Sequence, residues 1–124
     1  MVTIWVSDLQ RALEFYVDVL GMVKTAEFHD GVLPDIAWVV PSPASTVALA
    51  TEVGLEVAPI GDPRVGRFTG MVFTSNEIEE TYAELRAKGV RFTLELIRHP
   101  YGDGDGDQEA RFVDPDGNEF LLHT

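Results

Sequence analysis

Glu119 and His123, near the end of the chain, have the types and spacing that acid–base chemistry requires. Residues 118–123 alternate as a β-strand does, and positions an even number of residues apart share one face of a strand. A neutral histidine can take a proton from a bound molecule, and a carboxylate can assist it. The pair is a candidate for catalysis, and a surface histidine is the alternative. His29 and His99 lie in turn-like segments, which favours exposed imidazoles.

The two tryptophans, Trp5 and Trp38, could hold a planar molecule by stacking against it. Both lie in runs that predict β-strands, at residues 2–6 and 35–40. Tyr101 lies in a segment rich in glycine and aspartate that could cover an opening. Packing of both indoles in the core is the alternative, because large aromatic side chains are often buried. The aromatic residues thus allow either a binding site or an ordinary core.

The composition limits the kinds of partner. The chain has 124 residues, of which 45% are hydrophobic, enough for the core of one domain. With 21 acidic and 9 basic residues its formal net charge is -12, which disfavours nucleic acid and anionic membranes. The absence of cysteine excludes disulfides, thiolate catalysis and Cys-based zinc sites. No apolar run approaches the roughly 20 residues of a membrane span, and no signal-peptide pattern is present. We expect a soluble, cytoplasmic protein.

The elements that would position these side chains begin with a strand at residues 2–6 and a helix. Ser7 with Gln10 forms a capping box, and Gly21 suits the position after a helix end. Apolar residues at helical spacing predict one buried face, formed by Leu9, Ala12, Leu13, Tyr16 and Leu20. Three further strands are predicted at residues 22–28, 35–40 and 46–51.

The same plan repeats about 67 residues later. A strand at residues 68–74 precedes a helix with a second capping box, Asn76 and Glu79, which ends at Lys88 and Gly89. Its predicted buried stripe consists of Ile78, Tyr82 and Leu85. Three more strands follow, at residues 91–97, 109–113 and 118–123. We predict one domain over residues 1–124, made of a first module (1–52), a linker (53–67) and a second module (68–124).

Two motifs identify a family. The segment LEFYVDVLGM at residues 13–22 and the segment DPDGN at residues 114–118 resemble the vicinal oxygen chelate superfamily, which includes glyoxalase I, extradiol dioxygenases, fosfomycin-resistance enzymes and bleomycin-binding proteins. The resemblance implies an α+β fold in which two tandem βαβββ modules form cup-shaped mixed sheets. It also implies a homodimer whose cups enclose a small-molecule site.

The metal enzymes of that superfamily place their ligands at four strand positions. In this sequence those positions fall on Met1, Leu49, Phe68 and Leu121, none of which is a normal ligand for a hard metal. The resemblance therefore implies no metal site here, and no cofactor is predicted. A divalent metal remains the alternative, at a relocated site built from His123, Glu119 and His99.

The alternation of side chains along a strand predicts which other residues would line the cavity of the cup. If position 1 faces the cavity, Thr3 and Trp5 face it too, and Phe68 brings Gly70 and Val72 with it. The predicted ligand-binding residues are Thr3, Trp5, Trp38, Leu49, Phe68, Tyr101 and Leu121. Core packing is the alternative for each of the apolar residues.

These features support one leading function and two alternatives. The first is a metal-independent binding protein that sequesters an aromatic antibiotic or metabolite, and thereby gives antibiotic resistance, at a dimer interface. Its acidic composition favours neutral or cationic ligands. The second is a glyoxalase- or dioxygenase-type enzyme, a lyase, isomerase or oxygenase, with a non-standard site. The third is a protein whose cup is packed shut and whose dimer surface is the functional part.

Overall fold

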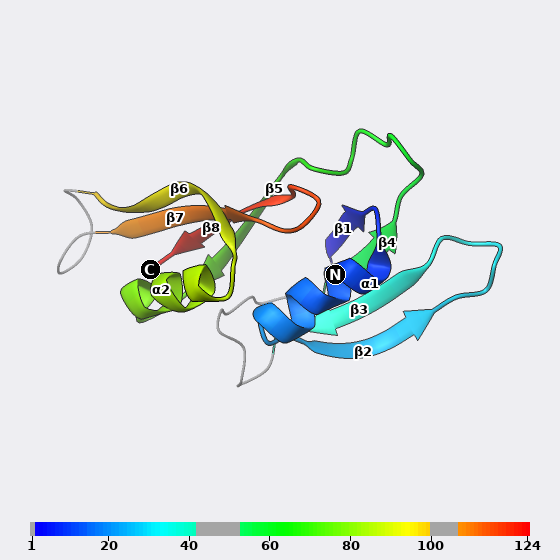
Figure 1. Ribbon diagram of the computed structural model, residues 1–124, viewed down its shortest axis with the longest axis horizontal. Helices are drawn as coiled ribbons and strands as arrows, with labels where there is room; N and C mark the ends of the chain where they lie inside the picture. The colour runs from blue at the N-terminus through cyan, green and yellow to red at the C-terminus, as the bar shows by residue number, and fades with distance from the viewer. Residues whose placement is uncertain (1, 42–52, 100–106) are drawn as a thin grey trace.

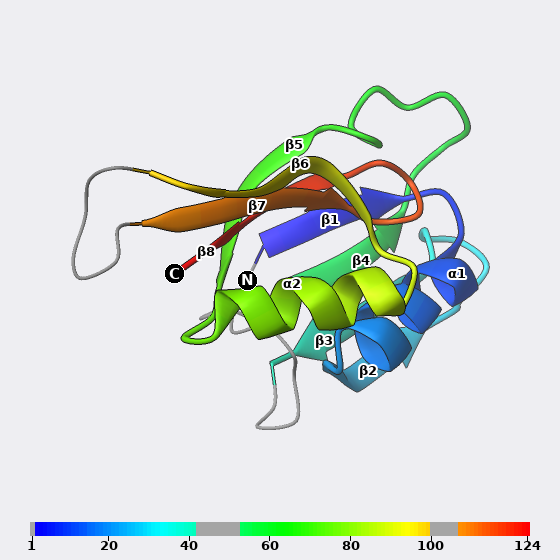
Figure 2. The same cartoon turned by 60° about the vertical axis from the view of Figure 1, so that its left-hand side comes forward.

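The computed structural model describes residues 2–41, 53–99 and 107–124, which form two four-stranded mixed sheets with helices packed on them (Figure 1). The predicted α+β fold with two βαβββ modules is confirmed. Figure 2 shows α2 (Ile78–Ala87) running along the second sheet, with β2 (Val23–Phe28) and β3 (Ile36–Val40) of the first sheet below it and α1 (Leu9–Leu13) to its right. No helix in this part of the chain is long and apolar enough to cross a membrane.

Each sheet has a parallel pair of strands at one edge and antiparallel strands beyond it. The first sheet is ordered β1 (Val2–Val6), β4 (Val53–Val57), β3 (Ile36–Val40), β2 (Val23–Phe28). The second is ordered β5 (Phe68–Thr74), β8 (Glu119–His123), β7 (Gln108–Val113), β6 (Arg91–Arg98). Except for β4, every strand begins and ends within one residue of its predicted bounds.

Strand β4 corrects the sequence prediction. It lies at Val53–Val57, inside the segment predicted as a linker, whereas the predicted strand at 46–51 lies outside the described residues. Val53 and Leu55 are fully buried, and the strand pairs in parallel with β1 along its whole length. Glycine and glutamate are depleted in strands, so the low β-propensity of Gly54 and Glu56 argued against a strand here. Pairing with β1 nevertheless stabilises β4.

The first helix begins one residue later than predicted. Asp8 is the N-cap, because its carboxylate accepts a hydrogen bond from the Arg11 amide at 3.0 Å, while the Ser7 hydroxyl binds Asp116. Helix α1 (Leu9–Leu13) continues as the π-helix η1 (Glu14–Val19). The helix ends at Gly21, whose φ of 80° favours glycine. The predicted buried face is confirmed at Leu9, Ala12, Leu13, Tyr16 and Leu20.

Helix α2 (Ile78–Ala87) ends as predicted but begins differently. Its first residues are held by Ser75, whose hydroxyl accepts a hydrogen bond from the Glu77 amide at 3.1 Å, and not by an Asn76–Glu79 capping box. Ile78 and Leu85 are buried as predicted. Tyr82 is half-buried and its ring centroid lies 4.5 Å from that of Phe92 on β6. The helix ends at Gly89, whose φ is 87°.

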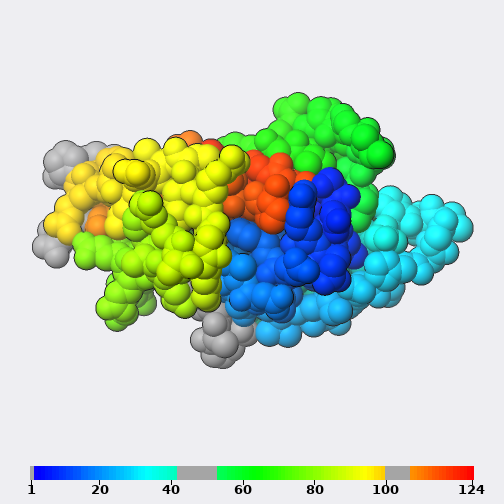
Figure 3. Space-filling model, in the orientation of Figure 1, coloured from blue at the N-terminus to red at the C-terminus, as the bar shows by residue number. Residues whose placement is uncertain are grey.

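A single hydrophobic core joins the two modules. From η1, the rings of Phe15 and Tyr16 contact Phe112 on β7 and Phe120 on β8, with centroids 6.5 Å and 6.2 Å apart. The helical segment of the first module therefore packs against the sheet of the second. Figure 3 shows the two modules in contact across the middle of the molecule, with the segment before β5, in green, along the upper edge.

Candidate ligand site on the open face

Each sheet has one face that the helices and core cover and one that they leave open. On β1, Ile4 and Val6 are buried, whereas Thr3 is exposed and Trp5 is half-buried. Strand β8 alternates in the same way, with Phe120 buried and Leu121 half-buried. We call the side opposite the helices the open face. Its residues include Thr3, Trp5, Trp38, Glu56, Phe68, Leu121 and His123.

A cavity of about 110 Å³ lies on this face between β1 and β5, and we call it the β1–β5 pocket. Its lining includes Thr3, Trp5 and Phe68, three of the residues predicted to bind a ligand. It also includes Arg64 and Arg67, which the sequence analysis did not identify because they lie in a segment rich in glycine and proline. The pocket therefore combines two aromatic rings with two cations.

Arg64 lies on the face of the Trp5 ring, with its guanidinium carbon 3.6 Å from the ring centroid. At this distance a cation is attracted by the electron-rich face of the indole. Asp62 holds the guanidinium by two hydrogen bonds, from Nε at 3.0 Å and from Nη2 at 2.7 Å. The hydrogen bonds from Arg64 lower the pKa of Asp62 to about 2, so its carboxylate is charged over the ordinary range of pH.

Phe68 also lies beneath a guanidinium, that of Arg111, at 5.3 Å from the ring centroid. The Arg111 Nη1 lies 3.6 Å from Glu119, and the Thr93 hydroxyl donates to the other Glu119 oxygen at 2.7 Å. The Arg111 Nε is buried and has no hydrogen-bond partner among the described residues. An arginine thus covers an aromatic ring on each of the two strands beside the pocket, Arg64 on Trp5 of β1 and Arg111 on Phe68 of β5.

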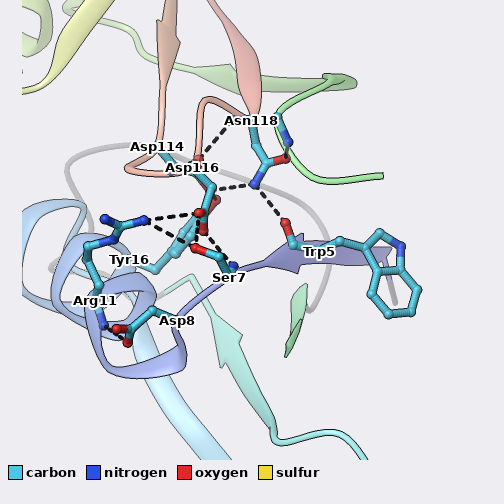
Figure 4. Close-up of polar contacts among 9 residues, drawn as sticks. Trp5, Ser7, Asp8, Arg11, Tyr16, Asp114, Asp116 and Asn118 are labelled. Atoms are coloured by element: carbon cyan, nitrogen blue, oxygen red, sulfur yellow. Dashed lines mark hydrogen bonds and ion pairs between the residues drawn. The ribbon is translucent and has the colours of Figure 1, made fainter. Parts of the chain in front are cut away.

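The turn before β8 holds this pocket together (Figure 4). Asn118 is buried, and its amide nitrogen donates to the Trp5 carbonyl oxygen at 3.0 Å. Its side-chain oxygen accepts a hydrogen bond from the Gly66 amide at 2.9 Å. One side chain therefore fixes both β1 and the segment that carries Arg64 and Arg67.

Asp114 organises the same turn from beneath. Its carboxylate accepts hydrogen bonds from the Tyr16 hydroxyl at 2.7 Å and from the Asn118 amide nitrogen at 2.9 Å. Burial raises the pKa of Asp114, and burial together with the Asp114 charge raises the pKa of Tyr16 well above its usual value. Residues 114–117 form a β-turn, in which the Gly117 amide donates to the Asp114 carbonyl oxygen at 3.0 Å.

Asp116 adds a second connection between the modules. It accepts hydrogen bonds from the Ser7 amide at 3.0 Å and from the Ser7 hydroxyl, and Arg11 lies 3.1 Å from the same carboxylate. In this structure the DPDGN motif therefore joins the start of the first helix to the end of the chain. The motif is structural, and its charged groups face partners within the protein.

Trp38 lies on the open face but outside the β1–β5 pocket. Its register partner on β4 is Gly54, which pairs in turn with Thr3 on β1, so a strand separates the two tryptophans. Its ring contacts Phe28 on β2 edge to face, with centroids 5.8 Å apart. The indole Nε1 is buried and has no hydrogen-bond partner among the described residues.

The structure does not bring the proposed catalytic pair together. Glu119 and His123 are four residues apart on β8, which corresponds to roughly 13 Å along a strand. Glu119 is bound by Thr93 and Arg111, and the His123 Nδ1 lies 2.9 Å from the Thr124 carbonyl oxygen. Direct hydrogen bonding between the two residues is excluded in this arrangement.

The other two histidines are paired with carboxylates. His29 bridges Glu27 at 2.9 Å and Asp35 at 3.1 Å near the tip of the β2–β3 hairpin. His99 lies 2.8 Å from Glu109. Glu109 is the register partner of His123 on β8, and the described residues contain no group of three or more His, Asp or Glu side chains that could hold a metal ion.

The strand registers also relocate one of the four metal-ligand positions. Val6 pairs with Val57 in the first sheet as Phe73 pairs with Leu122 in the second. The counterpart of Leu121 in the first module is therefore Glu56, in place of Leu49. Phe68 and Leu121 have no donor atom, and Met1, Leu49 and Tyr101 lie outside the described residues. These side chains do not fit a metal centre built on the four strand positions.

Comparison with known proteins covers nearly the whole chain. Residues 1–122 match the family described as Glyoxalase/Bleomycin resistance protein/Dioxygenase superfamily. The crystal structure of a member of that superfamily from Sphaerobacter thermophilus DSM 20745 is similar to this one, with a TM-score of 0.76. The two sequences are 34% identical, and the match covers 98% of this chain and 91% of that one. TnmS3, an antibiotic binding protein from Streptomyces sp. CB03234, is 27% identical, with a TM-score of 0.68 over 98% and 90%. The uncharacterized protein YetH of Bacillus subtilis (strain 168) is 27% identical over 98% of this chain and 92% of its own length.

Proposed function

The chain belongs to the Glyoxalase/Bleomycin resistance protein/Dioxygenase superfamily, and from this premise we propose that it binds an aromatic small molecule and leaves it chemically unchanged. The observation that carries this proposal is the β1–β5 pocket, where Trp5 and Phe68 present their rings beside two guanidinium groups. Side chains of this kind hold a planar ligand by stacking and need no metal. An antibiotic or an aromatic metabolite is the proposed ligand.

Two further facts support a binding role. Phe68 and Val72, on the same strand of the open face, are 54% and 41% exposed, and apolar side chains that are exposed together favour a surface that a ligand or partner covers. TnmS3, whose sequence and fold are similar over nearly the full length of both chains, is an antibiotic binding protein. The same role for this chain is our proposal.

We also propose that two copies combine their open faces into a homodimer. A cavity of about 110 Å³ is smaller than the 300–1,000 Å³ that ligand pockets usually provide, so one open face gives only part of a site. The same side of the sheets exposes Phe28 and Phe68, at 53% and 54%, together with Val72 and Ile97. A second copy would cover these residues and close the site. The cytoplasmic location stays a prediction.

The decisive test is titration with aromatic antibiotics and metabolites, followed by recovery of the bound compound. Tryptophan fluorescence should change saturably, and the Trp5→Leu variant should lose most of the affinity. Trp38→Phe is the matched control, since Trp38 lies outside the pocket. Mass spectrometry should show the ligand unchanged after long incubation, and a stoichiometrically converted product would sink the binding proposal.

A metal-free enzyme is the second candidate, and Glu56 favours it. This carboxylate occupies the open face beside Trp5 in the strand register, so it could remove a proton from a molecule stacked on the indole. The enzyme hypothesis predicts a product that disappears in Glu56→Gln while binding remains. The binding hypothesis predicts no product from either protein.

A further inference from the structure

The charge of the β1–β5 pocket is opposite to that of the protein as a whole. The chain has 21 acidic and 9 basic residues, yet the residues that line the pocket include two arginines and no acid. They are Val2, Thr3, Ile4, Trp5, Arg64, Arg67, Phe68, Thr69 and Asn118. A third arginine, Arg111, lies over the Phe68 ring. Three of the nine basic residues are therefore gathered around one small cavity.

The three arginines differ in how far their charge is neutralised. Arg64 is held by Asp62 through two hydrogen bonds, and Arg111 faces Glu119 at 3.6 Å. Arg67 donates from Nε to the Pro63 carbonyl oxygen and forms no ion pair with a carboxylate among the described residues. In so acidic a chain, a pocket arginine without a carboxylate partner leaves a positive charge facing the cavity.

We propose that the β1–β5 pocket binds the carboxylate of an aromatic acid, with Arg67 as its main partner and the ligand's ring system against Trp5 and Phe68. This inference rests on the proposed function and specifies its ligand class. A guanidinium presents N–H groups in a planar fork that matches a carboxylate. The cavity of about 110 Å³ suits such a substituent, while the larger ring system extends over the open face.

The net charge does not oppose this assignment. At physiological ionic strength, charges more than about 8 Å apart are largely screened, so the groups that line a pocket decide which charge it accepts. Global composition favours neutral or cationic ligands, whereas the charge of Arg67 in the lining of the pocket favours an anion. The protein's negative charge would then slow the approach of the ligand more than it weakens the bound state.

The test compares two probes that share a ring system, 2-naphthoate and 2-naphthamide, by isothermal titration calorimetry at pH 7. We expect the acid to bind at least about tenfold more tightly than the amide, the effect of one charge-assisted hydrogen-bonded pair. Arg67→Gln should abolish this preference, so that the acid and the amide bind the variant with equal affinity. Arg67→Lys keeps the positive charge but lacks the planar guanidinium, so it should retain part of the preference for the acid.

Arg86→Gln is the matched control, because Arg86 also stacks on an aromatic ring, that of Tyr82 at 5.5 Å, but lies on α2 outside the pocket. It should keep the full preference for the acid. Thermal unfolding of each variant verifies that the fold is retained, and a preference retained by a folded Arg67→Gln protein would overturn the role of Arg67.

The outcomes separate this inference from the proposed function. Equal affinity for acid and amide would overturn the carboxylate site and leave aromatic binding intact. Cyclohexanecarboxylate binding as tightly as 2-naphthoate would overturn the aromatic part of the inference. If neither naphthalene probe binds, the inference is overturned, and the wider panel of antibiotics and metabolites then decides whether the proposed function survives.

Discussion

The amide nitrogen of Asn118 lies 3.0 Å from the carbonyl oxygen of Trp5, which joins the final turn of the chain to its first strand. The two residues are 113 positions apart, and Trp5 carries the ring at the centre of the proposed site. Asn118 uses its other side-chain atom to hold Gly66, next to Arg67. One buried amide thereby sets the relative positions of the ring and the cations.

Replacing Asn118 by Ala should therefore cost both stability and binding. The change leaves the Trp5 carbonyl oxygen, the Gly66 amide and one oxygen of Asp114 without the partner that the amide supplies. We expect the free energy of unfolding to fall by about 3 kcal/mol, measured by chemical denaturation. Asn76→Ala, at an exposed position, is the control and should change it by less than about 0.5 kcal/mol. Equal stability of the two variants would contradict the assigned role.

Tyr16→Phe tests the contact beneath the turn. It removes the hydroxyl that donates to Asp114 at 2.7 Å in a buried site, while the ring keeps its place against Phe120. The expected loss of unfolding free energy is about 1–3 kcal/mol, because a buried carboxylate loses a donor. Tyr82→Phe is the matched control, since the Tyr82 hydroxyl accepts a hydrogen bond from the exposed Arg86 and does not contact a buried carboxylate among the described residues. An unchanged free energy of unfolding in Tyr16→Phe would show that the hydroxyl does not stabilise the fold.

The hairpin tip should respond to pH through His29. Hydrogen bonds to Glu27 and Asp35 raise the pKa of His29. Because the raised value belongs to the folded state, the protonated histidine stabilises the hairpin below the ordinary pKa near 6.5, and this contribution is lost as the pH rises through the folded pKa. NMR titration should give a pKa above 6.5 for His29, and Glu27→Gln should lower it. A value at or below 6.5 in the unaltered protein would refute the bridge.

Arg64 should protect one face of the Trp5 ring. In a Trp38→Phe background, fluorescence reports Trp5 alone, and Arg64→Gln should make it more accessible to acrylamide because the covering guanidinium is lost. Asp62→Asn should act in the same direction, since it removes both hydrogen bonds that hold the guanidinium. Arg98→Gln, which alters an exposed pair with Glu79, should leave the quenching unchanged. Unchanged quenching in Arg64→Gln would show that the stack does not persist in solution.

Much of the fold could be predicted because local signals and tertiary packing agree. The stripe that includes Leu13, Tyr16 and Leu20 marks the first helix, and glycines mark where both helices end. The cap shows the limit of such signals. Ser7 and Asp8 are adjacent, and either could cap the helix. The Ser7 hydroxyl instead binds Asp116, more than 100 residues away in the sequence, so Asp8 is the N-cap.

The site was predictable only in part. Strand parity predicted one face for Thr3, Trp5 and Phe68, and the three residues line the same cavity, because alternation is a local property of a strand. The position of β4, and with it Glu56, was missed although Val53, Leu55 and Val57 alternate as in a strand, because Gly54 and Glu56 weaken that signal and pairing with β1 decides the position. Arg64 and Arg67 reach the pocket through tertiary contacts of their segment, from Asn118 to Gly66 and from the Glu119 amide to the Arg67 carbonyl oxygen, and local sequence patterns do not report such contacts.

The contacts between the first helical segment and the final turn also bear on how the protein acquires its fold. During synthesis, β1 and the helix that follows leave the ribosome long before the turn that holds Ser7, Tyr16 and the Trp5 carbonyl oxygen. The rings of Phe15 and Tyr16 can likewise pack only after β7 and β8, which they contact, have been synthesised. Such sequence-distant contacts slow folding, since closing a long loop costs entropy before any contact compensates it. The final structure of the first module thus depends on residues translated about 100 positions later.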